Sequence, residues 1–207
     1  FKLGPALASG CSIIIKPSAL SPLSAYILGK IIHDIDFPAG VVNILSGPTS
    51  EVATTLSKSK IPAVLTMIGS TATGQRVIAD SATSIKKLSM ELGGNAPFIV
   101  FEDAAIDKAL DLAIGIKFGN SGQICVAANR FFVHKSLYNS FLEKYVERVN
   151  NLKLGFGIDQ KPDMGPMVTR NDRDRMFDLI NYAKEKGGVL LVGGEIPKGM
   201  EDGNWMM

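Results

Sequence analysis

Residues 11 to 48 read CSIIIKPSALSPLSAYILGKIIHDIDFPAGVVNILSGP, and the order of patterns in this stretch predicts the fold class. It opens with a short β-branched run that Pro17 ends, which is typical of a buried strand. Apolar residues then recur at helical spacing over 21–35, where Ser21 is placed to cap the helix. A Pro-Gly turn leads into a second apolar run over 41–45. A strand, a helix and a strand joined by short links predict a βαβ unit with parallel strands.

The same alternation continues to the end of the chain and predicts an α/β fold of parallel sheets covered by helices. The Gly93-Gly94 pair is the predicted hinge between two domains, 1–93 and 94–207. Beyond the first unit, strands are expected at 63–69, 97–101, 130–135 and 188–194, helices at 50–59, 71–83, 103–119, 136–152 and 171–187, and a Gly/Pro-rich loop at 153–169.

The composition excludes several classes of function. Of the 207 residues, 46% are hydrophobic and 20% are charged, and the net charge is +2 with no basic stripe, so nucleic acid is not expected as a partner. The apolar runs are too short to span a membrane. Two cysteines and two histidines, all far apart in the chain, predict neither a disulfide framework nor a metal site. A reducing, cytoplasmic location fits this cysteine usage.

Two features in the first half point to an anionic ligand, and each has a simpler interpretation. Gly69 and Gly74 form a G-x-x-x-x-G turn between a strand and a helix, without the Lys-Ser/Thr of a P-loop. Its amides favour an anion, but Ser70 could equally be an ordinary helix cap. Lys16 ends a predicted strand, where ligands bind in open α/β sheets. It could also be a solvated lysine.

Two further residues are candidates for chemistry. Cys125 lies in FGNSGQICVAANR, between a glycine-containing turn and small apolar residues. A reactive thiol needs nearby amides or positive charge, whereas a cysteine is also commonly a small buried residue, which is the expectation for Cys11. Glu91 precedes a Leu-Gly-Gly bend and is either a functional carboxylate or an exposed one at the end of an element.

Six segments follow one another along the chain, namely FKLGPALASGCSIIIKPS, FPAGVVNIL, GSTATGQRV, MELGGNAPFIVFEDAAID, FGNSGQICVAANRFFVH and DMGPMV. Taken together, they resemble the aldehyde dehydrogenase superfamily over the whole chain. The resemblance implies a Rossmann-like cofactor domain and an α/β catalytic domain, each of them partial. Members of that family are more than twice as long, so the chain is expected to be a central fragment with little activity alone, from a homodimer or homotetramer.

The resemblance also implies a mechanism and its residues. Cys125 would attack an aldehyde and form a thiohemiacetal, with its own backbone N–H as an oxyanion donor. NAD or NADP would accept a hydride, which leaves an acyl thioester. Glu91 would be the general base that activates water to hydrolyse that thioester. The cofactor would contact Lys16, Ser18, Gly69, Ser70 and Gly93.

One departure from the family pattern bears on the cofactor. Many members read Lys-Pro-Ser-Glu where this chain reads Lys-Pro-Ser-Ala, and Ala19 replaces a carboxylate that would repel a 2′-phosphate. NADP is therefore expected to be accepted and slightly favoured. The segments around Glu91 and Cys125 are most similar to the succinate-semialdehyde and glyceraldehyde branches.

Three other functions compete with this one. The first is a CoA-acylating semialdehyde dehydrogenase, which has less use for Glu91. The second is a non-catalytic nucleotide-binding or assembly subunit. The third is a cysteine hydrolase, which requires a histidine partner that neither His33 nor His134 is placed to supply.

Overall fold

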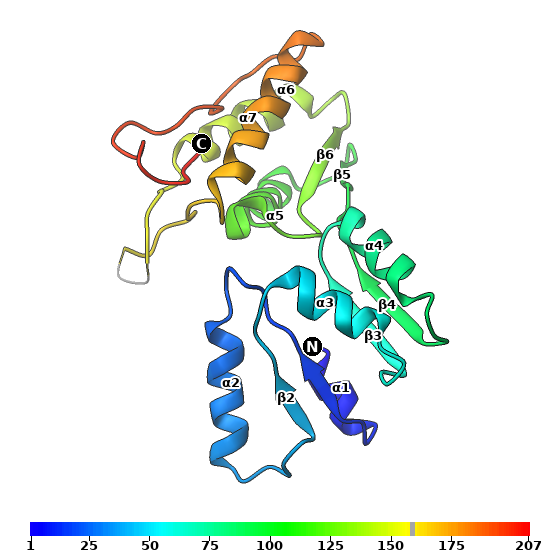
Figure 1. Cartoon of the computed structure of the whole chain (residues 1–207). Helices are drawn as coiled ribbons and strands as arrows, with labels where there is room; N and C mark the ends of the chain where they lie inside the picture. Colours follow the sequence, from blue (N-terminus) through cyan, green and yellow to red (C-terminus); the bar gives the residue numbers. More distant parts are fainter. Residues whose placement is uncertain (158–159) are drawn as a thin grey trace. The chain divides into compact units, whose positions relative to one another are not determined.

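The computed structural model describes residues 1–157 and 160–207 and contains two compact units, Phe1–Gly93 and Gly94–Met207. The boundary between the units falls within the Gly93-Gly94 pair. Residues 158–159 of the expected Gly/Pro-rich loop lie outside the described residues. Figure 1 shows the elements of both units.

The first unit begins with the predicted βαβ arrangement. Helix α1 (Leu3–Ala8) precedes strand β1 (Ile13–Ile15), which pairs in parallel with β2 (Val42–Ile44). Helix α2 (Leu23–Asp34) connects these strands and lies beside β2 (Figure 1). The parallel pairing follows from the helical crossover, because a helix between two strands returns the chain to the same end of the sheet.

A second parallel pair completes this unit. Helix α3 (Thr49–Lys58) is followed by β3 (Val64–Ile68), α4 (Thr71–Ser81) and β4 (Lys87–Glu91), and β3 pairs with β4. Strand β4 was not predicted, although its sequence KLSME alternates polar and apolar residues as a half-buried strand does. Its pairing with β3 makes it a strand. Helix α1 was not predicted either, since Gly4 and Pro5 interrupt its pattern.

The second unit repeats the plan with one parallel pair and three long helices. Strands β5 (Ala96–Val100) and β6 (Ala128–Val133) are connected through α5 (Ile106–Phe118) and a short 3-10 turn η1 (Gly119–Gly122). Helices α6 (Tyr138–Asn150) and α7 (Arg170–Glu185) follow. The core lies where α5 and α6 meet the strands and consists of Val100, Leu110, Ala113 and Phe141, with Phe98, Phe131 and Tyr145 packed against it.

Most of the expected elements are confirmed to within a few residues, and two expectations about secondary structure and capping are wrong. Residues 188–194 form no strand: no strand ladder includes them in the described part of the chain, and Val189 is 81% exposed. An apolar run needs a partner strand for its backbone groups before it becomes a strand. Ser21 does not cap α2, because Pro22 occupies the cap position and no side chain bonds there.

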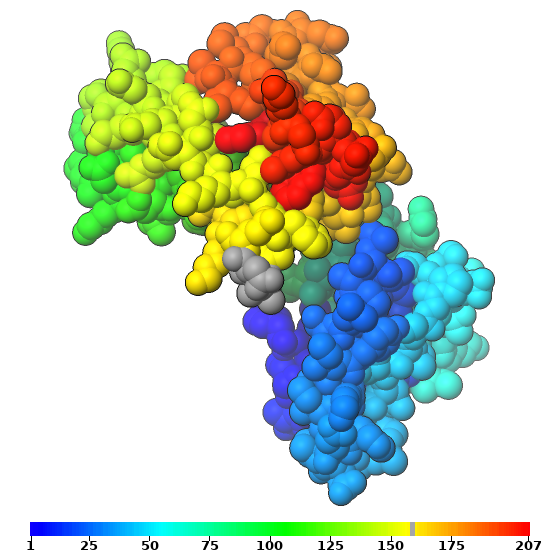
Figure 2. Space-filling view, turned by 90° about the vertical axis from the view of Figure 1, so that its left-hand side faces the viewer, coloured from blue at the N-terminus to red at the C-terminus, as the bar shows by residue number. Residues whose placement is uncertain are grey.

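Helix α2 presents an apolar stripe to solvent. Its segment lies at the surface in the space-filling view, in blue (Figure 2). Large apolar side chains at every fourth position are exposed there, namely Leu23, Ile27, Ile31 and Ile35. Spacing of four residues places them on one face of the helix. No helix within the described residues is both long and apolar enough to cross a bilayer.

Candidate functional site

Lys16 lies at the carboxyl edge of the first strand pair. It directly follows β1, and its Nζ donates to the carbonyl of Pro17 and to Thr49 Oγ1, both at 3.0 Å. The side chain is therefore held between the end of β1 and the start of α3 and is not freely solvated. This is the edge at which open α/β sheets bind ligands.

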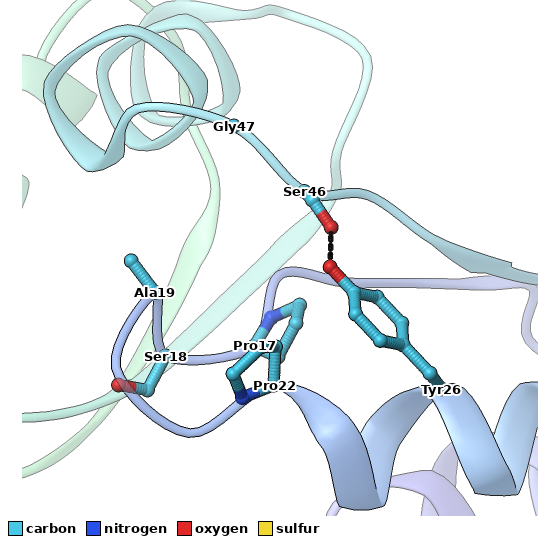
Figure 3. Close-up of a pocket in the computed structure, with 7 residues that line it drawn as sticks. All are labelled: Pro17, Ser18, Ala19, Pro22, Tyr26, Ser46 and Gly47. Atoms are coloured by element: carbon cyan, nitrogen blue, oxygen red, sulfur yellow. Dashed lines mark hydrogen bonds between the residues drawn. The ribbon is translucent and has the colours of Figure 1, made fainter.

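A small hollow opens at the same edge (Figure 3). Its volume is about 170 Å³. Ser18 Oγ accepts from the backbone N–H of Leu20 at 3.2 Å, and its side chain points away from the Tyr26–Ser46 pair. The hollow is lined by Pro17, Ser18, Ala19, Pro22, Tyr26, Ser46 and Gly47.

In the turn after β3, Ser70 caps helix α4, which is one of the two interpretations that the sequence allowed. Ser70 Oγ accepts from the backbone N–H of Thr73 at 3.2 Å, so Ser70 is the N-cap of α4. The N–H of Gly69 donates to the carbonyl of Glu91 at 3.0 Å. A Cβ at Gly74 would lie 2.7 Å from Leu92 Cδ2, so Gly74 allows α4 to pack closely on Leu92. Packing alone accounts for the second glycine of the motif.

Glu91 is the last residue of β4, and its side chain is exposed. In the parallel register it lies opposite Ile68, the last residue of β3. Glu91 and Ser70 therefore both lie at the carboxyl edge of this strand pair. Gly93 follows two residues later, and a Cβ there would meet only Thr71 Oγ1, at 4.0 Å.

The loop before Cys125 has an unusual backbone. Asn120 and Ser121 have φ of +50° and +57°, and Gly122 has φ of +72°, so three successive residues are left-handed. Two non-glycine residues in this conformation cost free energy and persist only where their surroundings hold them. Within the loop, the Asn120 amide donates to the Gln123 carbonyl at 3.2 Å, and the Gln123 amide donates to the Asn120 carbonyl at 3.0 Å.

Contacts from a distant segment also hold this loop. Ser121 Oγ donates to the carbonyl of Gly165 at 2.7 Å, and Gln123 Oε1 accepts from the N–H of Val168 at 3.0 Å. The segment 165–168 belongs to the DMGPMV motif. These two hydrogen bonds hold the left-handed turn against a second part of the same unit. Cys125 follows two residues after Gln123.

Cys125 is a free and exposed thiol in the second unit. Its carbonyl oxygen lies only 2.6 Å from where a Cβ of Gly94 would be, so the backbones approach as only glycine permits. Asn129 donates to the Gly94 carbonyl at 3.4 Å and accepts from Lys117 Nζ at 3.3 Å. Burial lowers the pKa of Lys117 below its usual 10.5.

The expectation that Cys11 is buried is wrong, because its thiol is also exposed. It lies in the turn after α1, next to Gly10 with φ of +73°, and its N–H donates to the Ala6 carbonyl at 2.9 Å. Because this turn lies at the surface, the Cys11 side chain is not packed into a core.

The predicted site residues fall into both units. Lys16, Ser18, Gly69, Ser70, Glu91 and Gly93 lie in the first unit, and Cys125 lies in the second. Within the described residues, no group of three His, Cys, Asp or Glu side chains could hold a metal ion.

Sequence reasoning missed three polar residues of interest. Tyr26 offered no signal beyond one aromatic ring on a helix, and Ser46 only its place before a Gly-Pro turn. The position of Gln123, two residues before Cys125, was visible, but its contact with Val168 was not.

Comparisons with known proteins agree with one another. All of residues 1–207 match the model of the aldehyde dehydrogenase family. The NADP(+) succinate-semialdehyde dehydrogenase 1 of Schizosaccharomyces pombe is 41% identical over 196 residues, which cover 94% of this chain and 39% of that protein. The NADP(+) succinate-semialdehyde dehydrogenase GabD of Escherichia coli is 40% identical over 194 residues, with 94% and 40% covered.

Solved structures give the same result. An NADP dependent enzyme of Escherichia coli has a TM-score of 0.95 at 38% identity, covering 99% of this chain and 42% of that chain. Betaine aldehyde dehydrogenase of Staphylococcus aureus, in complex with NAD+, has a TM-score of 0.94 at 32% identity, with 99% and 41% covered. The chain spans about two fifths of the length of the curated relatives it matches. Since the family model matches every residue, this chain belongs to the aldehyde dehydrogenase family.

Proposed function

We propose that the protein containing this chain oxidises an aldehyde to a carboxylic acid with NAD or NADP. The observation that carries the proposal is the exposed thiol of Cys125, which follows a left-handed turn fastened to residues 165–168. A nucleophile held on a rigid loop reacts with little loss of orientational freedom. Membership of the family supports the assignment of an aldehyde as substrate.

The chemistry proceeds in two stages at Cys125. The thiolate adds to the carbonyl carbon, and the backbone N–H of Cys125 donates to the oxygen that gains charge. The chemistry that NAD(P) would supply when bound is acceptance of a hydride from this carbon, and Cys125 would then hold the acyl group as a thioester. Glu91 takes a proton from a water that attacks the thioester carbon, and the carboxylic acid departs as the thiol is restored.

The first unit has features that suit a dinucleotide. Lys16 is held at the carboxyl edge of β1, next to a hollow in which Ala19 presents only a methyl group. Ser70 caps α4, whose N-terminal amides favour a pyrophosphate. Ser18 lies at the carboxyl edge of the β1–β2 pair, and Gly69 and Gly93 lie at the carboxyl edge of the β3–β4 pair. We therefore assign residues 1–93 to cofactor binding and residues 94–207 to catalysis.

We propose that the site accepts both cofactors and slightly favours NADP. No carboxylate at position 19 repels a 2′-phosphate, and three relatives carry NADP(+) in their names. Steady-state kinetics with both cofactors on the full-length protein test this assignment. A kcat/KM at least tenfold higher with NAD would contradict it.

The proposed substrate is a small semialdehyde or hydroxyaldehyde. Relatives at 38 to 41% identity are named for succinate semialdehyde, glutarate semialdehyde and D-glyceraldehyde. A panel of these three aldehydes, with acetaldehyde for comparison, tests the class. Detection of free acid and not acyl-CoA when CoA is present separates hydrolysis from the CoA-acylating alternative.

Substitution of the two functional side chains tests the mechanism in the full-length protein. Cys125→Ala should abolish turnover, whereas Cys11→Ala, the matched control, should retain it. Glu91→Gln should give one burst of reduced cofactor per site and then turn over about a hundredfold more slowly, because removing a general base costs about that much. Turnover by Cys125→Ala above a tenth of the unaltered protein would overturn the proposal.

We further propose a homo-oligomer and a reducing, cytoplasmic location. Two free, exposed cysteines are consistent with a reducing compartment. The exposed apolar stripe of α2 is consistent with further packing partners. Sedimentation of the full-length protein and fractionation of its host cells test these two assignments.

A further inference from the structure

Two hydroxyl groups meet at the hollow beside Lys16. Tyr26 reaches it from the first turn of α2, and Ser46 lies just after β2. Their side-chain oxygens are hydrogen-bonded to each other on one side of the hollow (Figure 3). A hydroxyl from the connecting helix and one from a strand end therefore converge at the carboxyl edge of the β1–β2 pair.

These groups have hydrogen-bonding capacity to spare. A tyrosine and a serine hydroxyl that bond each other use one of their two protons and retain the other, and both can turn towards a common acceptor. The ammonium of Lys16 has three protons, and the Pro17 carbonyl and Thr49 Oγ1 accept two of them. Pro17 itself lines the hollow. Two protons are thus free at or beside one small space, and the second hydroxyl proton also becomes available when both hydroxyls turn towards a ligand.

The charge and size of the hollow suit an anion. None of the seven residues that line it is acidic. Its volume of about 170 Å³ is several times the roughly 30 Å³ that a water occupies in the liquid, so a phosphate group has room. At the opposite wall, Ala19 occupies no more space than a methyl group.

We propose that Tyr26 and Ser46 are specificity-determining residues whose hydroxyls donate to the 2′-phosphate of NADP, with the ammonium of Lys16 supplying the charge. The proposal rests on the proposed function, because it needs the adenosine ribose at this edge. Ala19 only removes the repulsion of a 2′-phosphate. The two hydroxyls would stabilise the bound phosphate, because each donates a hydrogen bond to a charged acceptor.

The test uses two nucleotides that differ only in the group concerned. Adenosine 2′,5′-bisphosphate carries the 2′-phosphate and 5′-AMP lacks it. Isothermal titration of the full-length protein should show the bisphosphate binding at least tenfold more tightly than AMP. Tyr26→Phe, which removes one oxygen and keeps the ring, should weaken the bisphosphate about tenfold and leave AMP within twofold.

Two further variants make the result specific. Ser46→Ala should have a similar effect on the bisphosphate, and the double variant should lose less than the product of the two factors because the hydroxyls act together. Tyr182→Phe, on the exposed face of α7 in the other unit, should change neither affinity.

Each contrary outcome has its own meaning. Equal binding of bisphosphate and AMP by the unaltered protein, or no change in bisphosphate affinity on Tyr26→Phe, would overturn the role of the hydroxyls and leave the dinucleotide site standing. Equal losses for both nucleotides, with a lowered melting temperature, would assign Tyr26 a purely structural role. Binding of neither nucleotide would overturn the proposed cofactor site as well.

Discussion

Gln123 Oε1 and the backbone N–H of Val168 form a hydrogen bond of 3.0 Å that joins two segments 45 positions apart in the chain. A second bond, from Ser121 Oγ to the Gly165 carbonyl at 2.7 Å, runs beside it. Together these bonds hold the left-handed turn that leads to Cys125. The position of the thiol therefore depends on a segment that carries no reactive group of its own.

Gln123→Ala should lower kcat by roughly ten- to a hundredfold, because a nucleophile displaced by about 1 Å reacts that much more slowly. Loss of the bonds to Val168 and Asn120 should also cost about 1 kcal/mol of stability. Gln160→Ala is the matched control, since it removes a comparable bond to the Phe156 N–H outside this loop. An unchanged kcat with a lowered melting temperature would show that Gln123 is only structural.

Leu110→Ala should destabilise the second unit by about 3 kcal/mol, because the side chain is fully buried in the core and its loss leaves a cavity. Leu112→Ala, two positions along the same helix and 61% exposed, should cost less than about 0.5 kcal/mol. Urea unfolding followed by circular dichroism measures both. Similar losses at the two positions would contradict the burial pattern of α5.

Asp36→Gly should stabilise the first unit by about 0.5 kcal/mol. Asp36 has φ of +50° directly after the C-cap of α2, a position that glycine adopts without steric cost. Ala25→Gly, inside the same helix, should instead cost about 1 kcal/mol. Thermal melts of the two variants should therefore shift in opposite directions. A lower melting temperature for Asp36→Gly would refute the prediction.

Lys117→Met should raise stability at neutral pH. Burial lowers the pKa of Lys117 in the folded chain, so the unfolded chain binds more protons between that value and 10.5. Stability therefore rises with pH through this window, and the full penalty for burying the charge is present below it. The advantage of Lys117→Met should shrink as pH approaches 10.5.

Melting temperatures from pH 7 to 10.5 measure this effect, with Lys135→Met at an exposed position as the control. If Lys117→Met melted below the unaltered protein at pH 7, the bond from Lys117 to Asn129 would outweigh the cost of desolvation.

The 207-residue chain by itself should show little dehydrogenase turnover and should self-associate. Its strands occur only in two-stranded pairs among the described residues, and such pairs are marginal alone. Apolar side chains on and beside them are exposed, including Ile14, Leu45, Val64 and Ile68. Light scattering and an activity assay beside the full-length protein measure both properties. A monodisperse chain with full turnover would contradict the prediction.

Local patterns were sufficient for most of the fold. The β-branched run at 13–15, the helical spacing over 23–34 and the turn before residue 41 predicted the first βαβ unit, which is confirmed. These signals are local because side-chain periodicity follows directly from backbone geometry. The alternation of KLSME in β4 is a local signal that was overlooked, and pairing with β3 makes it a strand. Residues 188–194 were wrongly assigned because strand formation depends on a partner that a local pattern does not contain.

By itself, the sequence determined the fold class, and it predicted a boundary at Gly93-Gly94 and proposed Cys125 and Glu91 as candidates, because each rests on neighbouring residues. The tertiary structure alone decided that Gln123 contacts Val168 and that Tyr26 meets Ser46. These pairs lie 45 and 20 positions apart. Their contacts exist only after the chain has paid the entropy of closing long loops and packed its helices against strands, and no spacing within either segment encodes them.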